Sequence, residues 1–205
     1  MVFCAFCAVT PVSEGAENGS TATITIPTDG GWPEPTIDTN GTTIIDLKKD
    51  ITITSGIVLN KDSGDLRINL NGYKIVSDSE TLRVIQVTKN SGYAKTITID
   101  GSKEGSAIES KYMILGGGDA GAYTLNVLGG TYYGELRGFV IGQENNETDG
   151  ATATFSGAEI NSKGAAIWMS FGENKKMTGD RCTIDAPLGI CLLYTSPSPR
   201  DISGS

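Results

Sequence analysis

Short runs of alternating apolar and polar residues recur along the chain, and four of these runs align with one another. In each run the apolar residues stand at every second position, which is the period of a β-strand. The runs cover residues 66–72, 95–101, 123–129 and 151–157, and each of them ends in glycine. Successive terminal glycines lie 29, 28 and 28 residues apart. This regularity predicts repeated structural units that stack on one another.

The alternation divides the side chains of each run between an inner and an outer face. Two inner rows are predicted. One contains Ile68, Ile97, Leu125 and Ala153, and the other contains Leu70, Ile99, Val127 and Phe155. The outer row between them is predicted to be Asn69, Thr98, Asn126 and Thr154. A single unit cannot bury its apolar face alone, but stacked units bury continuous apolar rows.

Two further series of short apolar runs follow at nearly the same spacing. One series is Val84-Ile85, Met113-Ile114, Phe139-Val140 and Ile167-Trp168, and the other comprises residues 73–75, 131–133 and 158–160. Three strands per unit indicate a coil of a three-sided parallel solenoid. Residues 44–59 resemble an earlier coil, and residues 182–184 the start of a later one. A β-sandwich also has short, regularly spaced strands, but the near-constant period and matched glycines favour the solenoid.

The motifs INLNG at 68–72, TITIDG at 96–101 and LNVLGGTY at 125–132 carry a family resemblance. They resemble right-handed parallel β-helix proteins of the pectate-lyase-like superfold, in particular the adhesin-like surface proteins of gut microbes. The resemblance covers residues 42–190 and implies an all-β, single-stranded, right-handed parallel β-helix. A right-handed coil also agrees with the strong preference of crossover connections between parallel strands for the right-handed form. This superfold hosts lyases, hydrolases and non-catalytic surface proteins, so it implies a fold more than a reaction.

Both ends of the chain depart from the repeat. Residues 1–16 resemble part of a secretory signal peptide without its basic start, although a buried first strand is an alternative. Residues 17–41 are expected to form an N-terminal strand or cap region. Residues 191–205 resemble a translated sequencing adapter, the alternative being a native Ser/Pro-rich linker. We therefore expect coils over 42–190, a β-helix truncated at its C-terminus, and a secreted or cell-surface location in a bacterium or archaeon.

Composition excludes several classes of function. The formal net charge is −8, whereas nucleic-acid binding needs a concentrated basic surface. No segment reaches the roughly 20 apolar residues of a membrane-spanning helix. The chain has no histidine, which removes Ser-His and Cys-His nucleophile pairs and histidine-ligated metal sites.

Enzymes of the resembled superfold carry motifs that this chain lacks. The hydrolases carry Asn-Thr-Asp, Asp-Asp, Gly-His-Gly and Arg-Ile-Lys motifs, none of which occurs here. The lyases use calcium-binding aspartates with a basic residue on one strand face. Arg67, Arg83 and Arg137 are scattered, and none is expected to pair with an acidic cluster at coil spacing. We therefore predict no catalytic residue.

A cofactor is not expected either. Glu144, Glu147 and Asp149 lie in one acidic stretch that could bind Ca²⁺, but a solvated acidic loop is the simpler interpretation. We nominate no metal ligand.

A binding role rests on outward-facing side chains. Lys74, Tyr132 and Glu159 are expected at equivalent outward positions, and Trp168 is expected to point outward next to inward Ile167. An exposed Tyr or Trp could stack on a sugar ring of a polysaccharide or a host-surface glycan. Alternatively, Tyr132 and Trp168 pack beneath a loop.

The sequence thus predicts a non-catalytic secreted or cell-surface β-helix module with an adhesin-like, structural or glycan-binding role. The alternative is a fragment of a polysaccharide lyase or glycoside hydrolase of the same superfold.

Overall fold

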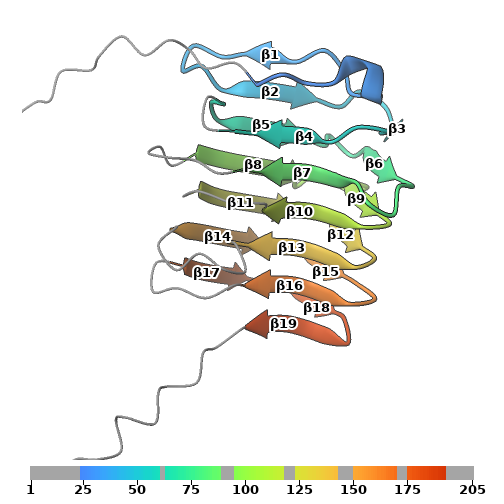
Figure 1. The fold of residues 1–205 in the computed structure, drawn as a ribbon, viewed down its shortest axis with the longest axis vertical. Coiled ribbons are helices and arrows are strands. Elements are labelled where there is room, and N and C mark those ends of the chain that lie inside the picture. Colours follow the sequence, from blue (N-terminus) through green and yellow to red (C-terminus); the bar gives the residue numbers. More distant parts are fainter. Residues whose placement is uncertain are drawn as a thin grey trace, which may run out of the picture.

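The computed structural model describes residues 24–60, 63–88, 95–117, 123–142, 150–169 and 175–192. In this part of the chain, short strands stack into three sheets that run along one long axis (Figure 1). Because the predicted signal segment (1–16), the acidic stretch (144–149) and most of the adapter-like tail (193–205) fall outside these residues, their predictions stay predictions.

Sheet A has seven strands in the order β1, β2, β5, β8, β11, β14 and β17. Their bounds are β1 Thr36–Ile37, β2 Thr43–Asp46, β5 Leu66–Asn69, β8 Lys95–Gly101, β11 Tyr123–Gly129, β14 Ala151–Ser156 and β17 Lys175–Asp180. Sheet A therefore contains the four runs whose repeat is visible in the sequence.

Sheets B and C have six strands each. Sheet B comprises β3 Ile51–Thr52, β6 Lys74–Ser77, β9 Ala107–Ser110, β12 Thr131–Gly134, β15 Glu159–Asn161 and β18 Thr183–Asp185. Sheet C comprises β4 Ile57–Leu59, β7 Arg83–Val87, β10 Met113–Gly117, β13 Arg137–Ile141, β16 Ala165–Met169 and β19 Leu188–Leu192.

From β2 onward, neighbouring strands in each sheet lie three strands apart in the chain and pair in parallel. Each coil therefore gives one strand to each sheet. This arrangement confirms the predicted parallel β-solenoid and excludes a β-sandwich, whose sheets are antiparallel.

The core lies inside the three sheets and consists of stacked inward rows. All eight residues predicted for the inner rows of sheet A are buried, with exposed fractions of 0–1%. Aromatic side chains fill the middle coils, where Phe139 makes edge-on contacts with Tyr132 and Phe155 at ring-centroid distances of 5.6 and 5.2 Å. The predicted outer row of Asn69, Thr98, Asn126 and Thr154 is only partly buried.

The register between β5 and β8 differs from the predicted alignment by two residues. Ile68 pairs with Ile99 and Asn69 with Asp100, so this coil takes 31 residues instead of 29. An even shift leaves every side chain on its predicted face, because strand side chains alternate with a period of two. The predicted faces are therefore right although the predicted partners are wrong.

In sheet C, the predicted alignment is right for one pair of neighbouring strands, β13 with β16, and wrong for two, β7 with β10 and β10 with β13. Phe139 pairs with Ile167 as predicted. Leu115, rather than Met113 or Ile114, pairs with both Ile85 and Phe139. The coil lengths vary on either side of β10, so a constant period misplaces this strand.

The predicted outward position of Tyr132 is wrong. Thr131 and Glu159 pair directly, and the same row reaches Lys74 through Ala107. Tyr132 instead pairs with the inward residues Ile108 and Ile160 and is 0% exposed. The cause is a pair of adjacent glycines before the strand: Gly130 occupies the place that Tyr73 and Ala158 take in other coils. The predicted alignment took the second glycine, Gly130, as the equivalent of the single glycine in other coils. This shifted β12 by one residue, so that its inward and outward side chains were exchanged.

A non-repetitive segment covers the first coil. Ile24, Ile26 and Trp32 are buried in the same core cluster as the coils, and the indole nitrogen of Trp32 donates a hydrogen bond to the Ser55 carbonyl oxygen at 2.7 Å. A 3₁₀ helix (η1, Thr28–Gly30) precedes Trp32. Strand β1 then pairs antiparallel with β2.

The last described strand, β19, continues through Cys191 and Leu192, which pair with Trp168 and Met169 of β16. These two residues, which resemble the start of the translated adapter, thus complete a strand. No helix among the described residues is long and apolar enough to cross a membrane.

Candidate functional site

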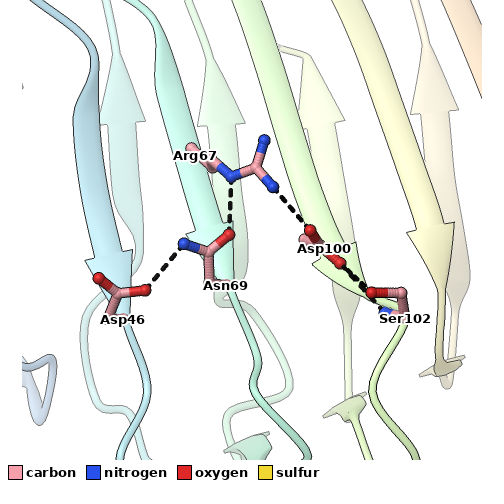
Figure 2. Close-up of polar contacts among 5 residues, drawn as sticks. All are labelled: Asp46, Arg67, Asn69, Asp100 and Ser102. Atoms are coloured by element: carbon pink, nitrogen blue, oxygen red, sulfur yellow. Dashed lines mark hydrogen bonds and ion pairs between the residues drawn. The ribbon is translucent and has the colours of Figure 1, made fainter. Parts of the chain in front are cut away.

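A connected set of polar side chains crosses the outer face of sheet A (Figure 2). We call Asp46, Arg67, Asn69, Asp100 and Ser102 the polar ladder. The guanidinium of Arg67 donates from Nε to Asn69 Oδ1 at 2.7 Å and from Nη2 to Asp100 Oδ2 at 2.6 Å. Asn69 Nδ2 donates to Asp46 Oδ1 at 2.8 Å, and Ser102 Oγ donates to Asp100 Oδ1 at 2.6 Å. The ladder therefore joins three successive coils.

Strand register places these side chains together. Asp46, Asn69 and Asp100 occupy one row across β2, β5 and β8. Neighbouring strands lie about 4.8 Å apart, so short polar side chains in one row reach each other. Arg67 stands two residues before Asn69 on the same face and bridges to the next coil with its longer side chain. The ladder thus follows from stacking and needs no special backbone geometry.

Asp100 is held in its charged form. Burial by itself would raise its pKa, but hydrogen bonds from the Ser102 side chain and backbone, together with the charge and hydrogen bond of Arg67, outweigh burial and lower the pKa below its ordinary value. The side chains of Arg67 and Asp100 remain 39% and 22% exposed. The charged groups are therefore fixed by their neighbours and still reachable from solvent.

The polar character continues beyond the ladder along sheet A. The row of Arg67 continues through Thr98, Asn126, Thr154 and Thr178. The row of Asp100 continues through Leu128, Ser156 and Asp180. Apart from Leu128, hydroxyl, amide and carboxylate groups thus repeat along the solenoid axis at the strand spacing.

No arginine was expected to pair with an acidic cluster at coil spacing; Arg67 does pair at coil spacing, but with the single carboxylate of Asp100. The predicted alignment placed Asn69 beside Thr98, whereas the structure places it beside Asp100. The two-residue shift in register hid the acidic partner. The sequence did contain a sign of this row: Asp46, Asn69 and Asp100 are each the last outward polar residue of a strand before a turn.

Of the predicted binding residues, Lys74 and Glu159 lie in one groove. Its volume is about 530 Å³, and it runs along the corner between sheets A and B. Lys74 Nζ lies 3.2 Å from Glu109 Oε1, and Glu159 accepts a hydrogen bond from Asn161 Nδ2 at 3.0 Å. Five of its fourteen lining residues are glycines. Lys74 and Glu159 therefore each have a polar partner already.

The ring of Tyr132 is not exposed in that groove, so no sugar can stack on it. Its ring lies in the core, and its hydroxyl has no hydrogen-bond partner in the described part of the chain. The phenol pKa is raised, first by burial and second by the nearby charge of Asp100. Tyr132 is therefore a core residue.

Trp168 is half-buried next to the buried Ile167. The guanidinium carbon of Arg137 lies 3.9 Å from the centroid of the Trp168 ring, which is a cation–π contact. One face of the indole is thereby occupied by Arg137. The residues that follow, 170–174, lie outside the described residues, so the alternative of packing beneath a loop stays open.

No group of three or more Cys, Asp or Glu side chains in the described residues is arranged to hold a metal ion. The ladder carboxylates of Asp46 and Asp100 are separated by Asn69 and Arg67 (Figure 2). The ladder therefore offers hydrogen-bond donors and acceptors rather than a cluster of oxygen ligands.

Neither a scan against protein-family models nor searches of curated proteins and of solved structures find a match to this chain. The chemistry of the outer faces is therefore the basis for a functional conclusion.

Proposed function

We propose that the chain is a non-catalytic β-solenoid module of a secreted or cell-surface protein and that it binds a neutral polysaccharide across the outer face of sheet A. The polar ladder is the observation that carries this proposal. Its guanidinium, amide and carboxylate groups hold one another in place through bonds of 2.6–2.8 Å. Groups that are already ordered lose little conformational entropy when a ligand binds.

The repeat of sheet A matches a repetitive ligand. Hydroxyl, amide and charged groups recur on successive strands at about 4.8 Å. A polysaccharide presents hydroxyl groups at regular intervals, so successive coils can contact successive sugars. The net charge of −8 disfavours polyanions, which is why we propose a neutral polymer.

The charge state of Asp100 argues against one role in hydrolysis, that of the general acid. A glycosidase needs one carboxylic acid whose pKa is raised, so that it can protonate the leaving oxygen. The pKa of Asp100 is lowered instead. Its carboxylate is suited to accept hydrogen bonds from sugar hydroxyls.

Affinity electrophoresis of the chain in gels containing xylan, glucomannan or β-glucan tests the proposal. We expect retardation by at least one of them. Replacing Arg67 with Ala removes a charged donor and should weaken that binding about tenfold or more, because hydrogen bonds to charged groups contribute about 1.5–3 kcal/mol.

Lys163→Ala is the matched control. Lys163 makes a comparable cross-coil ion pair, 2.9 Å from Glu135, away from sheet A. Both variants should remain folded and lose a similar, small part of their stability in urea denaturation, because each loses one partly exposed ion pair between coils. Equal binding by the Arg67 and Lys163 variants would contradict the proposal. An unsaturated product released from polygalacturonate would instead favour a lyase.

A further inference from the structure

A cleft of about 590 Å³ opens at the N-terminal end of the solenoid. Its outer wall comes from the segment that leads into β1, including Trp32, Pro33 and Glu34. Its inner wall comes from the first coil, including Ile44 and Asp46 of β2. The cleft thus lies between the non-repetitive segment and the first coil.

The cleft is continuous with the polar ladder through a shared residue. Asp46 lines the cleft and also accepts the hydrogen bond from Asn69 at 2.8 Å. Thr36, which pairs with Ile44 in the outermost strand pair of sheet A, lines the cleft as well. A ligand that follows the ladder toward β2 therefore meets this cleft at the limit of the sheet.

The lining combines one apolar side with several polar groups. The apolar side of the cleft comes from the partly exposed Pro33 and Ile44, whereas Trp32 is 4% exposed and is fixed in the core by its hydrogen bond to the Ser55 carbonyl oxygen. Glu34, Lys48 and Lys49 are exposed around the opening, and the two lysines form no ion pair with the described residues. An apolar side with a few polar groups around it suits a sugar ring, which has an apolar face and hydroxyl groups at its edge.

We propose that this cleft receives the terminal sugar of the polysaccharide whose internal sugars lie on sheet A. The inference rests on the proposed function and adds a direction to it: the polymer ends at β2, with the terminal ring against the apolar side formed by Pro33 and Ile44. Glu34, Asp46, Lys48 and Lys49 are then placed to bind its hydroxyl groups. The chain accordingly distinguishes polymer ends from internal segments.

The test compares intact xylan, glucomannan or β-glucan with short fragments of the same polymer at equal mass concentration. We measure binding to the parent chain by affinity electrophoresis and by competition with the fragments. Fragments have more ends per unit mass, so they should compete more strongly than the intact polymer, in proportion to the number of ends.

Two variants address the cleft directly. Thr36→Trp places a large side chain into the cleft from an exposed strand position, and Lys48→Ala removes a polar group with little risk to the fold. Thr183→Trp, at an exposed position of β18 in sheet B, is the control for an added aromatic side chain. With both cleft variants, fragments should no longer compete more strongly than the intact polymer, although the intact polymer should still bind. With the control variant, fragments should compete more strongly, as they do with the parent chain.

The outcomes separate the two proposals. Equal competition by fragments and intact polymer in the parent chain, with binding still dependent on Arg67, would overturn the chain-end inference and leave the sheet A proposal standing. The same holds if the cleft variants retain the fragment advantage. Binding to none of the three polysaccharides would overturn both.

Discussion

The hydroxyl oxygen of Tyr132 lies 2.8 Å from the point where a Cβ atom on Gly101 would stand. The same Cβ would lie 3.0 Å from the Gly130 Cα atom. Tyr132 is fully buried and packs edge-on against Phe139, so its ring has no free space into which to withdraw. The absence of a side chain at residue 101 is therefore a packing requirement of the neighbouring coil.

Gly101→Ala should lower the free energy of unfolding by about 1–3 kcal/mol, the usual cost of overpacking. Urea denaturation measures this change. Combining it with Tyr132→Phe removes the opposing oxygen, and part of the loss should be recovered. Tyr132→Phe alone should cost little, since the hydroxyl has no hydrogen-bond partner in the described residues.

Gly179→Ala is the control for that experiment. An added Cβ at this exposed strand position meets no atom within 4 Å. Its stability should stay close to that of the parent, and a loss equal to that of Gly101→Ala would show that crowding against Tyr132 is not the cause.

Acid should weaken the fold partly through Asp100. Its pKa is lowered in the folded state, so its carboxylate contributes stability that is complete above the ordinary Asp pKa and is lost as the pH falls through the folded value. Urea midpoints measured from neutral pH down to about pH 3 should therefore fall less steeply in Asp100→Asn than in the parent.

Asp185→Asn provides the comparison, because Asp185 is exposed in sheet B. This variant should retain the acid-induced loss of the parent. An Asp100→Asn profile parallel to that of the parent would contradict the role assigned to Arg67 and Ser102.

Phe139 should be among the most sensitive positions of the core. It is fully buried and contacts aromatic rings in its own coil and in the next one. Phe139→Ala should cost about 3–5 kcal/mol in urea denaturation, and Phe139→Leu clearly less, because a smaller cavity remains. Equal losses would indicate that the surrounding coils collapse around the vacated space.

The contact between Arg137 and Trp168 should contribute modestly to stability. Arg137→Gln is expected to cost at least about 0.5–1 kcal/mol and to shift the fluorescence of Trp168. Arg181→Gln is the control, because the Arg181 side chain is 81% exposed and pairs only with the adjacent, exposed Asp180 among the described residues. An unchanged emission spectrum in Arg137→Gln would argue against the stacked geometry.

Burial in sheet A could be predicted from the sequence because alternation is a local property. Ile68 and Ile99 face the core whichever coil partner each one has. Strand register depends instead on the length of each coil, and the coil from Asn69 to Asp100 is longer than the average repeat. The inner rows were therefore predictable, whereas the pairing of Arg67 with Asp100 was not.

The case of Tyr132 shows how one residue can reverse a functional prediction. Its place in the strand depends on whether Gly129 or Gly130 corresponds to the single glycine of other coils. Both glycines have positive φ angles, of 59° and 83°, so both belong to the corner. Residue identity alone does not distinguish the two alignments, and only one of them makes Tyr132 a surface residue.

The antiparallel pairing of β1 also bears on how such a molecule behaves at high concentration. The free edge of a coil can pair with a strand of another molecule, because the unpaired edge of a parallel strand can accept another strand of the same direction. At β2 that edge is occupied by a short strand of opposite direction, preceded by Pro33 and Pro35, which have no backbone N–H to donate. Within the described residues, sheet A ends on this side in a short strand that is a poor template for further growth, so we expect this edge to resist joining into fibres.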